Sequence, residues 1–147
     1  MQIEAGACGI AVAKLGEAEV MAAHGFDDIL IANEIIGDMK IAGLIRLSAE
    51  GLKISCCVDS ILGANRLSET FIQFGLQLNV YIEVDSGLER CGLNNSDDII
   101  FLAKQVSQMH GLRLRGLLTH AGQAYKAMTF GDIEQIGCRD SSKIVEI

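Results

Sequence analysis

Residues 81–93, "YIEVDSGLERCGL", place polar and charged side chains directly after a run typical of a buried strand. Asp85, Ser86, Glu89 and Arg90 follow that run within a few positions of one another. Side chains of these types can hold a proton, exchange hydrogen bonds and bind an anion. The neighbouring elements decide whether such groups form a site or only shape a turn.

Polar side chains also end the other apolar runs of the chain. The strand-end residues are Lys14, Asn33, Asp59, Asp85 with Ser86, and Thr119 with His120. In a parallel α/β fold the carboxyl ends of the strands converge on one face, and binding sites are built there. Taken singly, Asp59, Ser60 or Ser86 could equally be a helix or turn cap. Five strands that all end this way favour a site on that face.

The hydrophobic pattern changes its period repeatedly along the chain. Short apolar runs predict strands at 9–13, 29–32, 54–58, 80–84 and 114–118, and most are near-continuous, as in strands covered on both faces. Helical stretches are predicted at 16–24, 61–74 and 97–110, and each ends at a glycine. This alternation indicates parallel βαβ units, which leaves an open doubly wound sheet or a (β/α)₈ barrel. Neither GxGxxG nor a Walker loop is present.

Composition limits the class of protein. The 147 residues predict one domain, 1–147, and half of them are hydrophobic. The net charge of −7 argues against nucleic acid or an anionic membrane as a partner. No apolar run approaches the roughly 18 residues of a membrane span, and the start lacks the features of a signal peptide. The five cysteines form no CxxC pair, and the adjacent Cys56 and Cys57 point to opposite faces of a strand, so we expect no metal site. We expect the thiols to be reduced and the protein to be cytoplasmic.

Three stretches together resemble one known family. They are "GACGIAVAKLGEAEVMAAHGFDDILIANEIIG" (6–37), "IEVDSGLERCGL" (82–93) and "RGLLTHAGQAY" (115–125). Their order and content are similar to the alanine racemase N-terminal-like family of pyridoxal 5′-phosphate (PLP) barrels, most closely the D-threonine aldolase and D-serine dehydratase branch. The resemblance implies an incomplete parallel (β/α) barrel of TIM type, with about five consecutive βα units that correspond to strands 2–6 of eight.

The resemblance also implies cofactor-binding residues. Arg90 corresponds to the family arginine that hydrogen-bonds the phenolic oxygen of PLP, where a fixed cation keeps the oxygen anionic and orients the ring. His120 corresponds to a ring that packs on one face of the pyridine. We expect Asn33, Asp59 and Tyr125 to complete the cofactor-binding set. From the residues alone, Arg90 could instead be a surface group paired with an acid of its own loop, and His120 an ordinary strand-end histidine.

The chain departs from the family pattern in several places. The family lysine that holds PLP as a Schiff base lies on the first barrel strand, whereas residues 1–6 resemble the end of the helix after that strand. We therefore assign no catalytic residue, and Lys14, which ends the next strand, is not given this role. The chain stops at Ile147 in what resembles the sixth helix, so the phosphate cradle and the β domain that holds the branch's divalent metal are expected to be absent. Gly122-Gln123 replaces the family "GH".

The expected parent activity is PLP-dependent chemistry on D-amino acids. Retro-aldol cleavage of a D-3-hydroxy amino acid, or the related dehydration, is the leading interpretation. We expect the full-length protein to be a homodimer and the 147-residue fragment to be inactive alone. Two alternatives stay open: an amino-acid racemase or non-catalytic PLP-carrier barrel, and a non-enzymatic βα module that binds phosphate or a protein.

Overall fold

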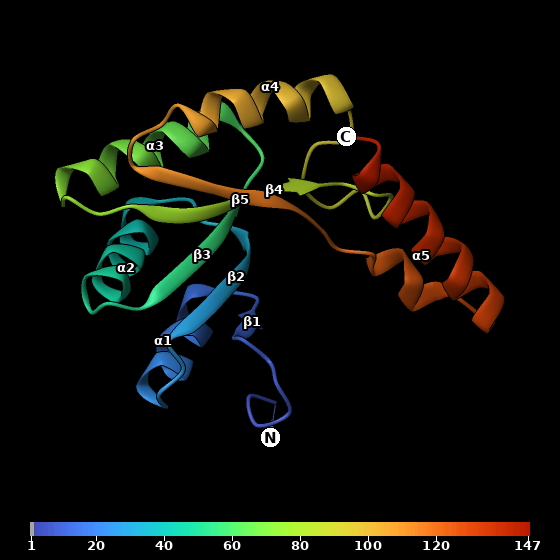
Figure 1. Ribbon diagram of the computed structural model, residues 1–147, viewed down its shortest axis with the longest axis horizontal. Coiled ribbons are helices and arrows are strands. Elements are labelled where there is room, and N and C mark those ends of the chain that lie inside the picture. Colours follow the sequence, from blue (N-terminus) through green and yellow to red (C-terminus); the bar gives the residue numbers. More distant parts are fainter. Residues whose placement is uncertain (1) are drawn as a thin grey trace.

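The structure, a computed structural model, describes residues 2–147 and alternates strands with helices along the chain (Figure 1). The elements in order are β1 (Ile10–Val12), α1 (Leu15–Ala23), β2 (Asp28–Glu34), α2 (Asp38–Ala49), β3 (Lys53–Val58), α3 (Ile61–Gln73), β4 (Leu78–Val84), α4 (Ser96–Ser107), β5 (Leu112–Thr119), the 3₁₀ helix η1 (Gly122–Lys126) and α5 (Phe130–Val145). The five predicted strands and three predicted helices are confirmed, with ends displaced by a few residues.

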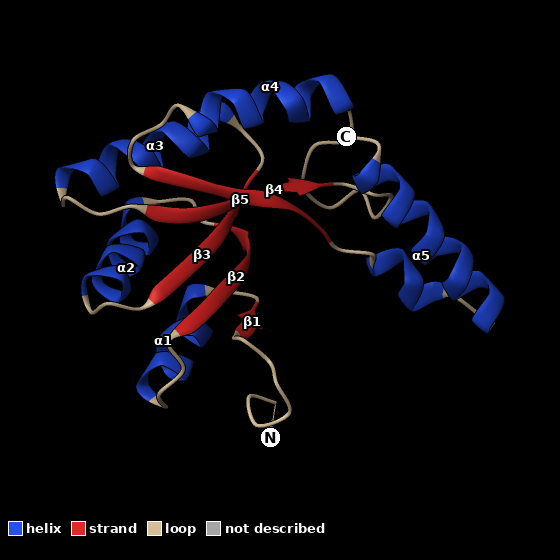
Figure 2. Ribbon diagram, in the orientation of Figure 1, coloured by secondary structure: helices blue, strands red, loops and turns tan. Residues whose placement is uncertain are grey.

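The sheet distinguishes between the two architectures that the alternation left open. Its strand order is β1-β2-β3-β4-β5, and all neighbouring pairs are parallel. A doubly wound sheet would reverse its order at a switch point, whereas a barrel adds each strand beside the previous one. The sheet curves, and α1 to α4 cover its convex face (Figure 2). The fold is therefore a partial (β/α) barrel, as the resemblance implied.

The hydrophobic core lies between the sheet and the helices on that convex face. Alternate residues of β4 point into it, namely Leu78, Val80, Ile82 and Val84, and all are buried. Phe71 of α3 and Leu102 of α4 pack in the same cluster. The intervening residues of β4 point to the concave face, which would be the inside of a closed barrel.

Helix starts follow the capping rules. Ser60 caps α3 by accepting a hydrogen bond of 3.3 Å from the Gly63 N–H. Asn95, two residues before the predicted start at 97, caps α4, and Thr129 opens α5 with a capping box. Gly37 precedes α2 with a φ of 95° and provides no side-chain cap, which explains why no start of this helix was predicted.

Two expectations concern the ends of the chain. Residues 2–6 form consecutive turns, in which the Gly6 N–H donates to Ile3 O, the Ala7 N–H donates to Gln2 O and Gly6 has a φ of 99°. These bonds are the pattern in which a helix ends at a glycine, so the turns agree with the expected helix end. Met1 lies outside the described residues. At the other end α5 finishes at Val145, so Ile147 lies beyond the helix rather than inside it. None of the helices in the described part of the chain is long and apolar enough to cross a membrane.

Candidate functional site

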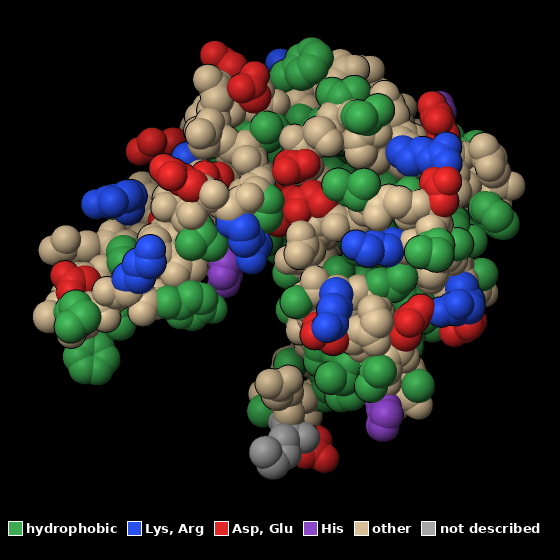
Figure 3. Space-filling model, turned by 180° about the vertical axis from the view of Figure 1, so that it is seen from behind, with side chains coloured by type: hydrophobic (Ala, Val, Ile, Leu, Met, Phe, Trp, Pro, Cys, Tyr) green, Lys and Arg blue, Asp and Glu red, His purple; other side chains and the backbone are tan. Residues whose placement is uncertain are grey.

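A cavity of about 530 Å³ opens on the concave face, between the first and last strands. Its apolar wall includes Ala11, Leu30, Ala32 and Leu118, from β1, β2 and β5. Its polar lining comes from the end of β5 with Thr119 and His120, from the loop after β4 with Arg90, and from α1 with Glu17. Seen from behind, a hollow separates the arm that carries α5 from the N-terminal units (Figure 3). The strand-end face thus holds a cavity large enough for a small aromatic ligand.

Arg90 is fixed by a buried carboxylate and not by the exposed acids of its own loop. Its Nη2 donates a hydrogen bond of 3.0 Å to Oε1 of Glu83, whose exposed fraction is 2 %. Its Nε lies 3.3 Å from Sγ of Cys91. These bonds to Cys91 and Glu83 raise the pKa of Arg90 above its already high ordinary value. The guanidinium is therefore a permanent, anchored cation, and 45 % of its side chain stays exposed.

The other polar residues of the loop build its conformation. Oδ1 of Asp85 accepts hydrogen bonds from the backbone N–H groups of Gly87 (2.9 Å) and Glu89 (3.0 Å). Burial acts to raise the pKa of Asp85, but these backbone hydrogen bonds outweigh it and lower the pKa. Thr119 donates a hydrogen bond of 2.9 Å to the Ser86 hydroxyl, which ties the ends of β4 and β5 together. Glu89 adopts a φ of 58°, which the turn holds in place.

His120 and Tyr125 form an aromatic pair beside Arg90. Their ring centroids lie 5.8 Å apart with an interplanar angle of 57°. Gly122 allows this close packing, because a Cβ there would lie 2.6 Å from Cδ2 of Leu88 and 2.9 Å from Nε2 of His120. Tyr125 is 84 % exposed and lies outside the lining of the cavity, so its role toward a cofactor stays a prediction. Arg90, His120 and Tyr125 are thus brought together from two separate segments.

Asn33 and Asp59 lie outside the lining of this cavity. Oδ1 of Asn33 accepts a hydrogen bond of 3.0 Å from the Glu34 N–H. Oδ2 of Asp59 accepts a hydrogen bond of 3.4 Å from Gly92 N, and Asp59 lines a separate small cleft with Ser60. Both side chains hold backbone at strand ends, and their role toward a cofactor stays a prediction.

Two acids in the same region, the buried Glu83 and the half-buried Glu34, were not assigned from the sequence. Glu34 lies at the end of β2 and Glu83 on β4, and carboxylate oxygens of both lie within 4.8 Å of one another and of Cys91 Sγ. Burial, followed by the negative charges of Glu83 and Asp59, raises the pKa of Glu34 to about 7. Burial, together with the hydrogen bond to Glu83, raises the pKa of Cys91 to about 11, so its thiol is neutral. A charged residue inside the apolar run "YIEV" was the available signal.

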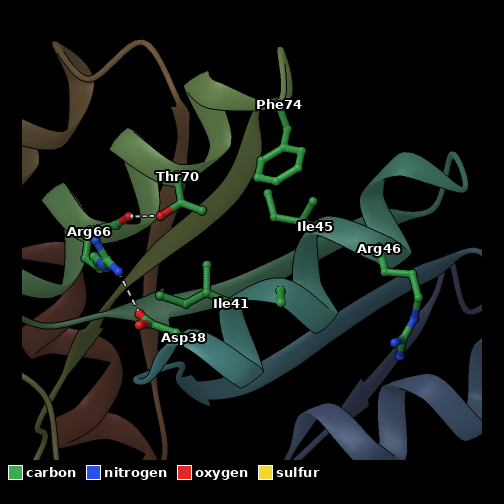
Figure 4. A pocket seen from close by; sticks show the side chains of 8 residues that line it. Asp38, Ile41, Ile45, Arg46, Arg66, Thr70 and Phe74 are labelled. Atoms are coloured by element: carbon green, nitrogen blue, oxygen red, sulfur yellow. Dashed lines mark hydrogen bonds and ion pairs between the residues drawn. The ribbon is translucent and has the colours of Figure 1, made fainter.

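A second groove lies on the helical layer between α2 and α3 (Figure 4). Ile41, Ile45 and Phe74 line it, and Arg66 donates a hydrogen bond of 2.7 Å to Asp38 at its rim. Both charged side chains are mostly exposed, so water and salt screen this pair and it adds little to stability. The groove is a packing seam between two helices and lies outside the strand-end face.

Comparison with known proteins agrees with this geometry. The family model for the alanine racemase N-terminal domain matches residues 1–140. This chain belongs to the alanine racemase N-terminal domain family. It is 35 % identical over 143 residues to D-threonine aldolase of Arthrobacter sp., which covers 97 % of this chain and 37 % of the relative. It is 32 % identical over 146 residues to D-threo-3-hydroxyaspartate dehydratase of Delftia sp., covering 99 % of this chain and 38 % of the relative.

A solved member with this domain shows the same arrangement of elements. The crystal structure of D-threonine aldolase from Filomicrobium marinum superposes with a TM-score of 0.91 at 31 % identity. The match covers 97 % of this chain and 38 % of that one. The chain therefore spans less than two-fifths of the length of the relatives it matches, and its strands form part of their barrel domain.

Proposed function

We propose that this chain supplies one side of a PLP site in an enzyme that cleaves or dehydrates D-3-hydroxy amino acids. The observation that carries the proposal is Arg90, which a buried glutamate anchors beside His120 at a cavity on the strand-end face. The relatives named for D-threonine and 3-hydroxyaspartate support this substrate class. The homodimer remains a prediction for the full-length protein.

The residues of the cavity fit one side of the cofactor. Arg90 uses one N–H toward Glu83 and one toward Cys91, and a guanidinium has five, so donors remain for an anionic phenolic oxygen. His120 offers a flat ring for the pyridine face. Among residues 2–147, no lysine lines the cavity. The described residues therefore fit the ring and its oxygen, but they supply neither covalent attachment nor a phosphate cradle.

Each residue has a defined task in this proposal. When bound, PLP would delocalise the electron pair left when a substituent departs from Cα of the amino acid. Arg90 would bind and orient the cofactor oxygen, and His120 would exclude water from one face of the ring. Because no lysine reaches the cavity, we expect the chain alone to bind weakly and to release no acetaldehyde from D-threonine. The divalent metal expected for this branch is not assigned to residues of this chain.

Equilibrium titration with PLP, followed by absorbance, tests the proposal. Arg90→Ala should weaken binding by roughly 1.5–3 kcal/mol, the range for a hydrogen bond to a charged group. Arg90→Lys should restore only part of the loss, because an ammonium does not reproduce the planar fork. Arg113→Ala is the matched control, since Arg113 is an exposed arginine of β5. Unchanged affinity in Arg90→Ala would show that the site is assigned wrongly.

A further inference from the structure

The anchor of Arg90 contains one acid more than its charge requires. Glu83 points from β4 to the concave face and is almost fully buried. The register between β2 and β3 shifts from Ile31↔Cys56 to Glu34↔Cys57, and this irregularity places Glu34 beside the same region. Two carboxyl groups thus meet next to a single guanidinium.

The hydrogen bonds around these carboxyl groups are unevenly distributed. Oε1 of Glu83 accepts from Arg90 Nη2 at 3.0 Å and from the Cys91 thiol at 3.0 Å. Oε2 of Glu83 and Oε1 of Glu34 are buried and have no hydrogen-bond partner among the described residues, although carboxylate oxygens of the two groups lie within 4.8 Å of one another. Two ionised carboxylates cannot form a hydrogen bond, because neither carries a proton. One proton between them would satisfy both oxygens.

We propose that Glu34 and Glu83 share one proton, and that this carboxyl–carboxylate pair is the positioning element that fixes Arg90 at the cavity. With that proton in place, the negative charge on the pair equals the positive charge of Arg90. Without it, two negative charges, one buried and one half-buried, would face one guanidinium, and like charges within 4.8 Å oppose each other's ionisation. The raised pKa of Glu34 agrees with this assignment.

The surroundings of the pair favour a proton over a metal ion. The titratable groups around it are Cys56 and Cys57 of β3, Asp59 directly after β3, and Arg90 and Cys91 of the loop after β4. Burial raises the pKa of the Cys56 thiol to about 12 and that of Cys57 higher still, so both are neutral. Glu34, Glu83 and Cys91 could present three ligand atoms to a cation. However, the raised pKa keeps the Cys91 thiol protonated, whereas a metal ligand must be a thiolate, and the Arg90 guanidinium bound to Glu83 opposes a second cation beside it.

The effect of this pair on PLP binding rests on the function proposed above. The shared proton itself does not depend on that function. Glu34 does not contact Arg90 through any hydrogen bond of the structure, so it acts through Glu83. Loss of the proton would add negative charge behind Arg90 and reduce its attraction for an anionic ligand. Arg90 should therefore bind such a ligand best when Glu34 holds its proton.

Infrared spectroscopy of the 147-residue chain with ¹³C-labelled glutamate tests the shared proton directly. At about pH 6, where an ordinary glutamate is ionised, the wild type should show the C=O stretch of one un-ionised carboxyl group, and this band should disappear as the pH passes about 7. Glu34→Gln should abolish the band, and Glu50→Gln, at an exposed position, should keep it. Absence of the band in the wild type would overturn the proposal. Stoichiometric Zn²⁺ uptake that releases the proton and is lost in Glu34→Gln would replace it with a metal site.

Titration with PLP across a pH series tests the positioning role. Glu83→Gln should weaken binding about tenfold or more at every pH, because the charged anchor of Arg90 is lost. Glu34→Gln keeps a donor toward Glu83, so it should bind like the wild type at about pH 6 and lack the wild type's loss of affinity above about pH 7. Wild-type affinity in Glu83→Gln would overturn the positioning role. If neither the wild type nor any variant binds PLP, the proposed function fails. The infrared band still shows whether the carboxyl pair holds a proton.

Discussion

Lys143 of α5 donates a hydrogen bond of 2.7 Å from Nζ to the backbone carbonyl oxygen of Asp85, 58 positions earlier in the chain. This bond joins the last helix to the loop that carries Arg90. Gln123 of η1 provides a second tie, since its Nε2 donates to both carboxylate oxygens of the buried Asp140 at 3.0 and 3.1 Å. Outside these contacts α5 stands away from the other helices (Figure 1).

Lys143→Met should loosen this helix while keeping the length and apolar part of the side chain. The unfolding free energy should fall by about 1–2 kcal/mol, because a partly buried carbonyl loses a charged donor. Amide hydrogen exchange in 130–145 should accelerate at the same time. Lys104→Met, on the exposed side of α4, is the control and should change little. Unaltered exchange in α5 would show that the bond does not hold the helix.

Borohydride reduction after mixing with PLP should label no single lysine stoichiometrically. The reason is that no lysine of the described residues lines the cavity, and Lys14 is largely exposed beside Glu17 at 3.9 Å. Scattered, partial labelling of exposed lysines is the expected result, read by peptide mass spectrometry. Full labelling of one lysine would contradict the expectation, and labelling of Lys14 would identify a replacement for the family lysine.

Glu34 should make stability depend on pH. Its pKa is raised from 4.5 in the unfolded chain to about 7 in the fold, so its contribution is complete below 4.5 and is lost as the pH rises to about 7. Over this window the unfolding free energy should fall by at most about 3 kcal/mol through this group. Urea unfolding at several pH values, compared between wild type and Glu34→Gln, isolates the effect. Equal pH dependence of the two proteins would count against the raised pKa.

The sequence predicted the strands well because a covered parallel strand is apolar along most of its length. It placed their ends less well, since polar residues such as Asp28 and Lys53 begin strands and pair with one another across β2 and β3. The range of α2 was not predicted, because Gly37 starts the helix through its backbone conformation alone. These ends depend on neighbours in space, which a one-dimensional pattern does not contain.

The candidate site was predicted in part. Arg90 and His120 do meet at one cavity, because the loop after β4 and the end of β5 lie side by side. Asn33 and Asp59 do not line this cavity. The Asn33 carboxamide and the Asp59 carboxylate each accept a hydrogen bond from a nearby backbone N–H instead. Glu83 was read only as part of a strand. Its position between Ile82 and Val84 marks a buried charge, which always needs a partner.

The isolated chain should associate with itself through its sheet edges. Within residues 2–147, β1 and β5 each pair with only one neighbour, and five parallel strands do not close a barrel. Unpaired edges and an open concave face favour pairing with other chains. The net charge of −7 opposes this, so salt should strengthen association. Sedimentation velocity over a concentration series at low and high salt measures it, and a compact monomer throughout would mean that the edges are covered in another way.

The strand order also bears on how the chain folds during synthesis. Each strand pairs with the one made immediately before it, and no pairing waits for a distant segment. The growing chain can therefore add one βα unit at a time to a sheet already present at the ribosome exit, without threading or rearrangement. Such a fold should tolerate slow translation, because a pause after any unit leaves earlier pairings satisfied and exposes only the newest edge.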